Sequence, residues 1–121
     1  MKGILIDAKT NTISRVEGIK DYKDMQTVIG CSCFTSCFTG DALPAGDTLY
    51  VDDEGLMNGT QEFFYNPDIY PHPLAGNGLI LGCNQSTGES KDAASEVADI
   101  AEKTVFLTRS EVARLANRHN W

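Results

Sequence analysis

The sequence predicts a small α+β protein, with one mixed or antiparallel sheet of about five strands and two or three short helices. Its 121 residues suffice for one modest core, and neither an internal repeat nor a linker divides them. Short segments of alternating apolar residues, typical of strands, are separated by turns rich in Gly, Pro and Asn. Other segments repeat apolar residues every three or four positions, as helices do. We therefore expect a single domain over residues 1–121.

The N-terminal quarter predicts a β-hairpin and a helix. A strand at residues 2–8 places its apolar side chains on one face, and a turn leads to a return strand at 12–17. Residues 20–29 predict a short helix, because apolar side chains recur there at helical spacing. Gly30 follows as a C-terminal stop.

The middle of the chain predicts a second hairpin and a buried strand. Strands at 33–38 and 48–52 are expected to pair across a long connection. Residues 53–77 are irregular and rich in Gly, Asn, Pro and aromatic residues, with a short helical turn near 60–65. The apolar run at 78–83 predicts a buried strand.

The C-terminal third predicts two helices. After a polar loop, alanine and valine spacing indicates a helix over about 93–103, and the apolar link at 105–107 has the composition of a strand. Thr108 and Glu111 then stand at the spacing of a capping box, which predicts a last helix at 109–118.

The net charge of −7 comes entirely from the middle of the chain. No Lys or Arg occurs from residue 24 to residue 90, whereas nine acids do. These acids are Asp24, Asp41, Asp47, Asp52, Asp53, Glu54, Glu62, Asp68 and Glu89. Such a field repels phosphate backbones and attracts cationic partners, although it also serves solubility alone.

The sequence predicts a cytoplasmic protein with reduced cysteines. No apolar run is long enough for a membrane helix, and the N-terminal one is too short for a signal peptide. A reducing compartment argues against disulfides between Cys31, Cys33, Cys37 and Cys83. Three of the four alternate along an expected strand, a spacing that cannot bring their sulfurs around one zinc ion. We expect buried structural thiols, no metal and no cofactor.

Catalytic patterns are weak, so we expect a binding protein rather than an enzyme. A nucleophile would need His72 or His119 as its base, and His119 lies near the chain end. His72 lies between two prolines, which hold it extended and suit it to a binding site. The acids at 52–54 lack the ligand order of a calcium loop. DNA binding is not expected, because the last helix has no basic recognition helix after it.

The glycine turn before the buried strand is a candidate anion site. Gly76, Asn77 and Gly78 precede a strand, whereas a dinucleotide fingerprint opens a helix. Gly76 or Gly78 is expected to adopt positive φ. Bare backbone N–H groups in such a turn can form an anion nest.

Three motifs together resemble a known family. They are MKGILID, GDTLYVDDEG and YPHPLAGNGLILG, at residues 1–7, 46–55 and 70–82. In order and spacing they resemble a family of small uncharacterised proteins carried by phages, prophages and plasmids. The resemblance covers about 1–84 and extends toward 107, whereas the helix at 109–118 looks like an addition. It brings no catalytic residues, and it implies an accessory protein that counters host defence by stoichiometric binding.

The first functional hypothesis is sequestration of a nucleotide immune signal. Aromatic side chains would stack on the base, and the glycine turn would hold phosphate. Arginines from elsewhere in the fold, or from a second subunit of a homo-oligomer, would supply positive charge. The residues are Tyr65, Tyr70, His72, Gly76, Asn77, Gly78, Arg15, Arg109 and Arg114.

Two alternatives remain beside it. The acidic middle could imitate nucleic-acid charge and block the basic groove of a host nuclease or CRISPR effector. A metal-assisted hydrolase would instead use Asp47, Asp52, Asp53 and His72.

Overall fold

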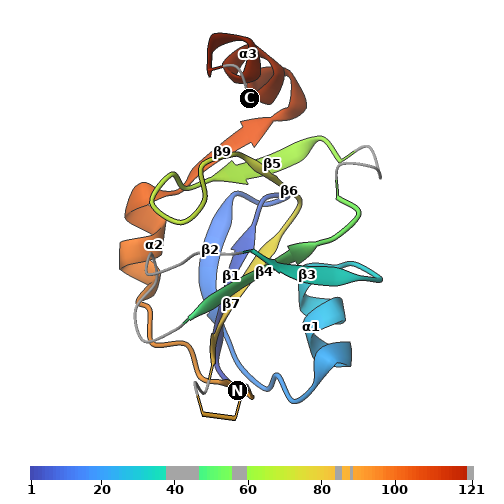
Figure 1. The fold of residues 1–121 in the computed structure, drawn as a ribbon, viewed down its shortest axis with the longest axis vertical. Helices are drawn as coiled ribbons and strands as arrows, with labels where there is room; N and C mark the ends of the chain where they lie inside the picture. Colours follow the sequence, from blue (N-terminus) through green and yellow to red (C-terminus); the bar gives the residue numbers. More distant parts are fainter. Residues whose placement is uncertain (38–46, 56–59, 84–85, 88, 120–121) are drawn as a thin grey trace.

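The computed structural model describes residues 1–37, 47–55, 60–83, 86–87 and 89–119. Within them the chain forms two antiparallel sheets and three helices. This confirms the predicted α+β class with a sheet of about five strands. Figure 1 shows how these elements are arranged. No helix in these ranges is long and apolar enough to cross a membrane.

The large sheet has the order β2-β1-β7-β4-β3, and a short strand, β8, pairs with β7. Its strands are β1 Gly3–Asp7, β2 Thr12–Val16, β3 Phe34–Cys37, β4 Thr48–Asp52, β7 Gly78–Cys83 and β8 Ser90–Lys91. Both predicted hairpins are confirmed by the antiparallel pairing of β1 with β2 and of β3 with β4. The long connection of the second hairpin, with Phe38, lies outside the described residues.

Strand β7 is the centre of the fold. It pairs with both β1 and β4, and Leu79, Ile80 and Leu81 are fully buried. A strand buried on both faces reads as a continuous apolar run, which is why its sequence does not alternate. Ile80 faces one core cluster, and its two leucine neighbours face another.

The small sheet has the order β6-β5-β9. It consists of β6 Leu74–Ala75, β5 Glu62–Tyr65 and β9 Val105–Thr108. The helical turn expected near residues 60–65 was therefore wrong. Phe63 and Phe64 are both buried, on opposite faces of β5 as strand geometry requires. Adjacent apolar residues are ambiguous between helix and strand, and pairing with β9 decided between them.

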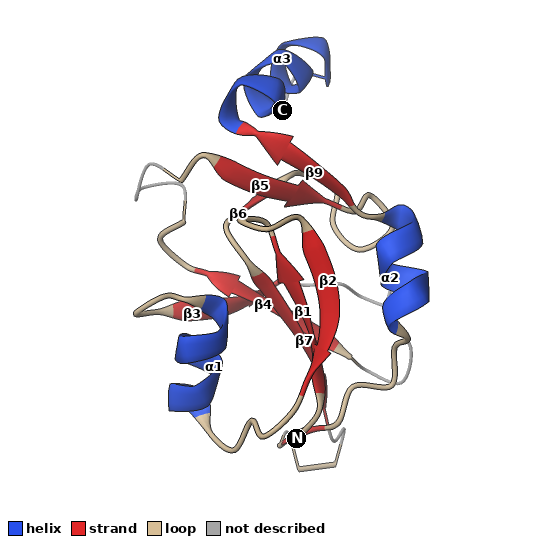
Figure 2. Ribbon diagram, turned by 180° about the vertical axis from the view of Figure 1, so that it is seen from behind, coloured by secondary structure: helices blue, strands red, loops and turns tan. Residues whose placement is uncertain are grey.

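The two sheets enclose the main core. Phe64 of the small sheet packs with Ile4, Leu49 and Ile80 of the large sheet. Gly78 permits this approach, because a Cβ there would lie 2.7 Å from Cζ of Phe64. Figure 2 shows the small sheet above the large one, with α1 and α2 at opposite sides.

Helix α1, Tyr22–Ile29, covers the other face of the large sheet. Asp21 caps its first turn by accepting the N–H groups of Lys23 and Asp24. Gly30 ends it in the left-handed conformation at φ 80°, which confirms the predicted stop.

Helices α2, Val97–Lys103, and α3, Arg109–His119, flank β9. Helix α2 begins four residues later than expected, because the preceding segment is bonded to Asp47. Helix α3 begins as predicted. The side chain of Thr108 accepts the N–H of Glu111 at 3.2 Å, and the Glu111 carboxylate accepts the N–H of Thr108 at 3.0 Å.

Candidate functional site

The carboxylate of Asp47 ties the start of β4 to the segment before α2. Asp47 is buried, with an exposed fraction of 3%. Oδ1 accepts the N–H of Ala94 at 2.9 Å, and Oδ2 accepts the N–H and the hydroxyl of Ser95, both at 2.7 Å. Three donors compensate the burial of this group. Asp47 therefore contributes to the fold and adds nothing to the acidic surface.

The glycine turn uses its polar groups inside the fold. The N–H of Gly76 donates to the carbonyl of Glu62 at 2.9 Å, and Gly76 has the predicted positive φ, 79°. The Asn77 side chain accepts the N–H of Ala8 at 2.9 Å and so holds the β1–β2 turn. Gly78 is buried at the start of β7. The Gly76 amide that an anion nest would use is thus already bonded.

The predicted aromatic residues are divided between two places. Tyr70 packs against the core between the sheets, and its ring meets His72 edge to face at 6.0 Å between centroids. His72 is exposed and Tyr70 is half-buried. Tyr65 lies on the opposite face of β5 from Phe64, so it points away from that core. The structure brings Tyr70 and His72 together without Tyr65.

Two of the three predicted arginines contact different parts of the fold. Arg15 on β2 donates to the carbonyl of Ser95 at 3.4 Å and lies 3.8 Å from Glu96. Arg109 donates through Nε to the carbonyl of Thr60 at 2.9 Å. Its guanidinium stacks over the ring of Phe63 at 5.5 Å, so it serves the outer face of the small sheet.

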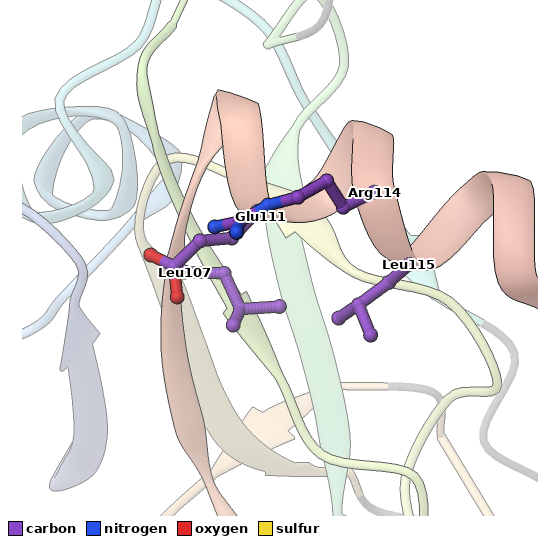
Figure 3. A pocket seen from close by; sticks show the side chains of 4 residues that line it. All are labelled: Leu107, Glu111, Arg114 and Leu115. Carbon is purple, nitrogen blue, oxygen red and sulfur yellow. The ribbon is translucent and has the colours of Figure 1, made fainter.

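Arg114, the third predicted arginine, borders a cavity of about 320 Å³ beneath α3. Leu107, Glu111 and Leu115 complete its lining among the described residues, and Figure 3 shows these side chains converging. The pKa of Glu111 lies below its ordinary value, chiefly because its carboxylate accepts hydrogen bonds from Thr108, with a contribution from the Arg114 charge. We call this space the α3 cavity.

A second cleft opens between the end of α1 and the end of β4. Its volume is about 610 Å³, and its lining is polar. The lining residues are Gln26, Thr27, Gly30, Cys31, Ser32 and Asp52. The carbonyl end of a helix carries partial negative charge, and α1 has no basic residue in its last turn. With the Asp52 carboxylate, this α1–β4 cleft favours a cationic group.

The cysteines are free and differ in exposure. Cys31, Cys37 and Cys83 are half-buried, whereas Cys33 is exposed, so the expectation of buried thiols was wrong for Cys33. Burial, with the nearby Asp52 and Cys33, raises the pKa of Cys31 to about 11. Burial also raises the pKa of Cys37. Both thiols are therefore protonated and poorly nucleophilic at neutral pH.

No three His, Cys, Asp or Glu side chains in the described ranges lie close enough together to hold a metal ion. The hydrolase alternative depended on such a cluster. Asp47 is committed to the segment before α2, and Oδ1 of Asp52 accepts the N–H of Glu54 at 2.9 Å within its own turn.

Residues 1–105 match the family described as a domain of unknown function, DUF3846. The chain belongs to this family. The match ends at the first residue of β9, so α3 lies outside the DUF3846 domain. The match confirms the resemblance to an uncharacterised family. No curated protein and no solved structure matches the chain.

The sequence indicated the acidic residue of the α1–β4 cleft but not the other residues that line it. Asp52 was visible as part of the acidic run. Gln26 and Ser32 carried no signal, although the Gln26 side chain donates to the carbonyl of Ser32 at 2.6 Å and shapes the cleft. Only the pairing of β3 with β4 brings the end of α1 beside Asp52.

Proposed function

We propose that this DUF3846 protein acts by stoichiometric binding of a basic protein, with the α1–β4 cleft receiving a Lys or Arg side chain. The observation that carries the proposal is the electronegative character of this cleft. Asp52 lines it, Asp53 and Glu54 follow as exposed acids, and the carbonyl end of α1 borders it. Between residues 24 and 90 the chain offers no Lys or Arg to neutralise these charges.

The genomic setting implied by the resemblance favours a target in host defence. An accessory protein of a phage or plasmid would gain from occupying the basic groove of a nuclease or CRISPR effector. Opposite fields accelerate such association, and like charge excludes nucleic acid from the same surface. The binding is then competitive with the nucleic acid that the target normally holds.

The test is capture of host proteins on the immobilised chain at low and high salt. A triple variant, Asp52→Asn, Asp53→Asn and Glu54→Gln, removes the charge beside the cleft and keeps the Oδ1 acceptor of residue 52. The matched control, Glu62→Gln, Asp68→Asn and Glu89→Gln, removes the same charge from exposed positions elsewhere. We expect a basic protein retained by the wild type and the control, released by salt, and lost by the triple variant.

The captured protein should then bind at a ratio of one to one in calorimetry and lose its nucleic acid on binding. A partner that both triple variants retain equally would contradict the cleft as the site. A partner of acidic charge would contradict the proposal as a whole.

Nucleotide sequestration is the second candidate, favoured by the exposed His72 ring held against Tyr70. Thermal melting against cyclic and ADP-ribose-type nucleotides, with divalent metals in parallel, tests it. A bound ligand at about 100 times its Kd would add about 2.7 kcal/mol of stability. His72→Ala should abolish the shift if the ring stacks on the base. A flat panel would contradict sequestration and leave the basic-protein proposal standing.

A further inference from the structure

Strand β9 is an apolar edge of the small sheet. In the described part of the chain it pairs with β5 alone, and its four residues are Val105, Phe106, Leu107 and Thr108. Val105 is 51% exposed, one of two large hydrophobic residues in the described ranges that are exposed. Edge strands are usually protected by charge, proline or a covering element, and β9 carries neither charge nor proline. This edge therefore has the character of an interface.

The hydrogen-bonding direction of β9 is fixed by the residue that follows it. The N–H of Arg109 donates to the carbonyl of Gln61 at 3.0 Å, so this pair is hydrogen-bonded. In an antiparallel ladder such pairs alternate, which makes Leu107 and Val105 the next bonded residues toward β5. The N–H and C=O groups of Phe106 consequently point away from β5, toward the open edge.

The N–H groups on either side of Phe106 along this edge are already used. The N–H of Thr104 donates to the carbonyl of Ala101 at 3.4 Å. The N–H of Thr108 donates to the Glu111 carboxylate at 3.0 Å. A strand that joins β9 would therefore form its central pair of hydrogen bonds at Phe106.

The α3 cavity opens on the same edge. Arg109 faces the β5 side of α3, where it contacts Thr60 and Phe63. Glu111 and Leu115 lie on the opposite flank of the helix, about 160° and 120° around its axis from Arg109 at 3.6 residues per turn. No β5 residue lines the cavity among those described, whereas Leu107 of β9 does, as Figure 3 shows. A strand added at this edge would pass beneath the cavity.

We propose that the added strand is β9 of a second copy, and that the protein forms a twofold dimer through antiparallel pairing of the two β9 strands. Phe106 lies opposite the partner subunit's Phe106, and each satisfies the other's outward N–H and C=O. Val105 lies opposite the partner subunit's Leu107. This is a non-hydrogen-bonded pair, in which side chains approach most closely. Each exposed valine therefore enters the other subunit's α3 cavity.

The exposed Val105 and the Leu107 wall of the α3 cavity lie on the same strand, which favours a second copy over an unrelated peptide because each copy supplies both parts of the contact. The twofold axis places the two α3 helices antiparallel on one face of the joined sheet. Each helix carries Glu111 and Arg114, which attract one another within the same subunit, so the flank that lines the cavity presents no excess of like charge to a second copy. The contact is self-complementary in backbone and in shape. Because α3 lies outside the matched domain, this dimer is an addition to the DUF3846 core.

The test is the molar mass of the full chain in solution, measured by light scattering over a concentration series with reductant present, since Cys33 is exposed. Val105→Lys places charges against the partner's cavity and should weaken dimerisation about tenfold or more. Tyr22→Lys is the matched control, because Tyr22 is 58% exposed on α1 and should not affect the dimer. Unchanged circular dichroism and melting of both variants at monomer concentrations would exclude misfolding.

Hydrogen exchange gives an independent readout. The Phe106 amide should exchange more slowly as wild-type concentration rises, and this dependence should vanish in Val105→Lys. A wild type that stays monomeric throughout the series would overturn the proposal. This holds also if β9 of that monomer is found to bind a peptide from another protein. A dimer that dissociates in Tyr22→Lys but not in Val105→Lys would also overturn it.

Discussion

The glycine turn at residues 76–78 and the unit of β9 and α3 use their polar groups in opposite ways. In the turn, the Gly76 amide and the Asn77 side chain are bonded to other strands of the same chain. On β9, the Phe106 backbone groups point outward beside an exposed Val105 and an open cavity. Polar groups that are hydrogen-bonded within the chain stabilise the fold. Backbone groups that point to solvent beside apolar surface indicate a binding partner.

Among groups whose hydrogen bonds are made within the chain, Asp47 should show the largest effect on stability when it is replaced. Asp47→Ala leaves the buried N–H and hydroxyl of Ser95, and the partly buried N–H of Ala94, without their acceptor, so we expect a loss of about 3 kcal/mol in the free energy of unfolding. Asp53→Ala removes an exposed acid and should change stability by less than about 0.5 kcal/mol. Denaturant unfolding measures both. Equal effects would show that Asp47 is not the structural carboxylate we describe.

Gly78 tests the contact between the two sheets. Gly78→Ala places a methyl group 2.7 Å from Cζ of Phe64, and we expect a loss of about 2 kcal/mol from overpacking. Adding Phe64→Leu should cost less in this background than in the wild type, because the smaller side chain relieves the clash. A double-mutant cycle in denaturant gives the coupling. Strict additivity would mean that the two residues do not meet.

Replacing Asn77 tests whether its side chain stabilises the fold or binds a ligand. Asn77→Ala removes the acceptor for the Ala8 N–H, and we expect a loss of about 1 kcal/mol in the absence of any nucleotide. Asn77→Asp keeps an oxygen acceptor and should recover most of it. If Asn77→Ala melts like the wild type, the Asn77 side chain does not stabilise the fold and is free to bind a ligand.

The cap of α3 gives the smallest effect and a pH dependence. The pKa of Glu111 is lowered in the folded chain, so its contribution to stability is fully present above the ordinary pKa of a glutamate and is lost as pH falls through the lower folded pKa. The protection of the amides in the first turn of α3, measured relative to their intrinsic exchange rate at each pH, should therefore fall only in acid. Glu111→Gln should remove this dependence, whereas an identical acid response in that variant would contradict the cap.

Local sequence determined most elements of the large sheet. The alternation at residues 48–52 and the apolar run at 78–83 matched β4 and β7 at both ends, because burial on one or both faces leaves its own pattern. The stop at Gly30 and the cap at Thr108 were equally local, since each depends on groups within one turn of the helix.

The candidate site was harder to predict, because it is made by neighbours that are distant in sequence. Asp52 meets the end of α1 only through the β3–β4 pairing, and Tyr65 and Tyr70 are separated by the face that each side chain takes. In the sequence Asp47 could not be distinguished from the other acids of the middle segment. In the fold it is buried, and its hydrogen-bond donors lie 47 and 48 residues further along the chain.

By itself, then, the sequence determined the α+β class, the central strand, two helix termini and the place of the charge. Tertiary structure decided that residues 62–65 are a strand, that one acid of the middle segment is buried, and that β9 is an edge. The physical reason is the same in each case. Propensity and capping act within a few residues, whereas strand pairing and burial depend on groups that only the folded chain brings together.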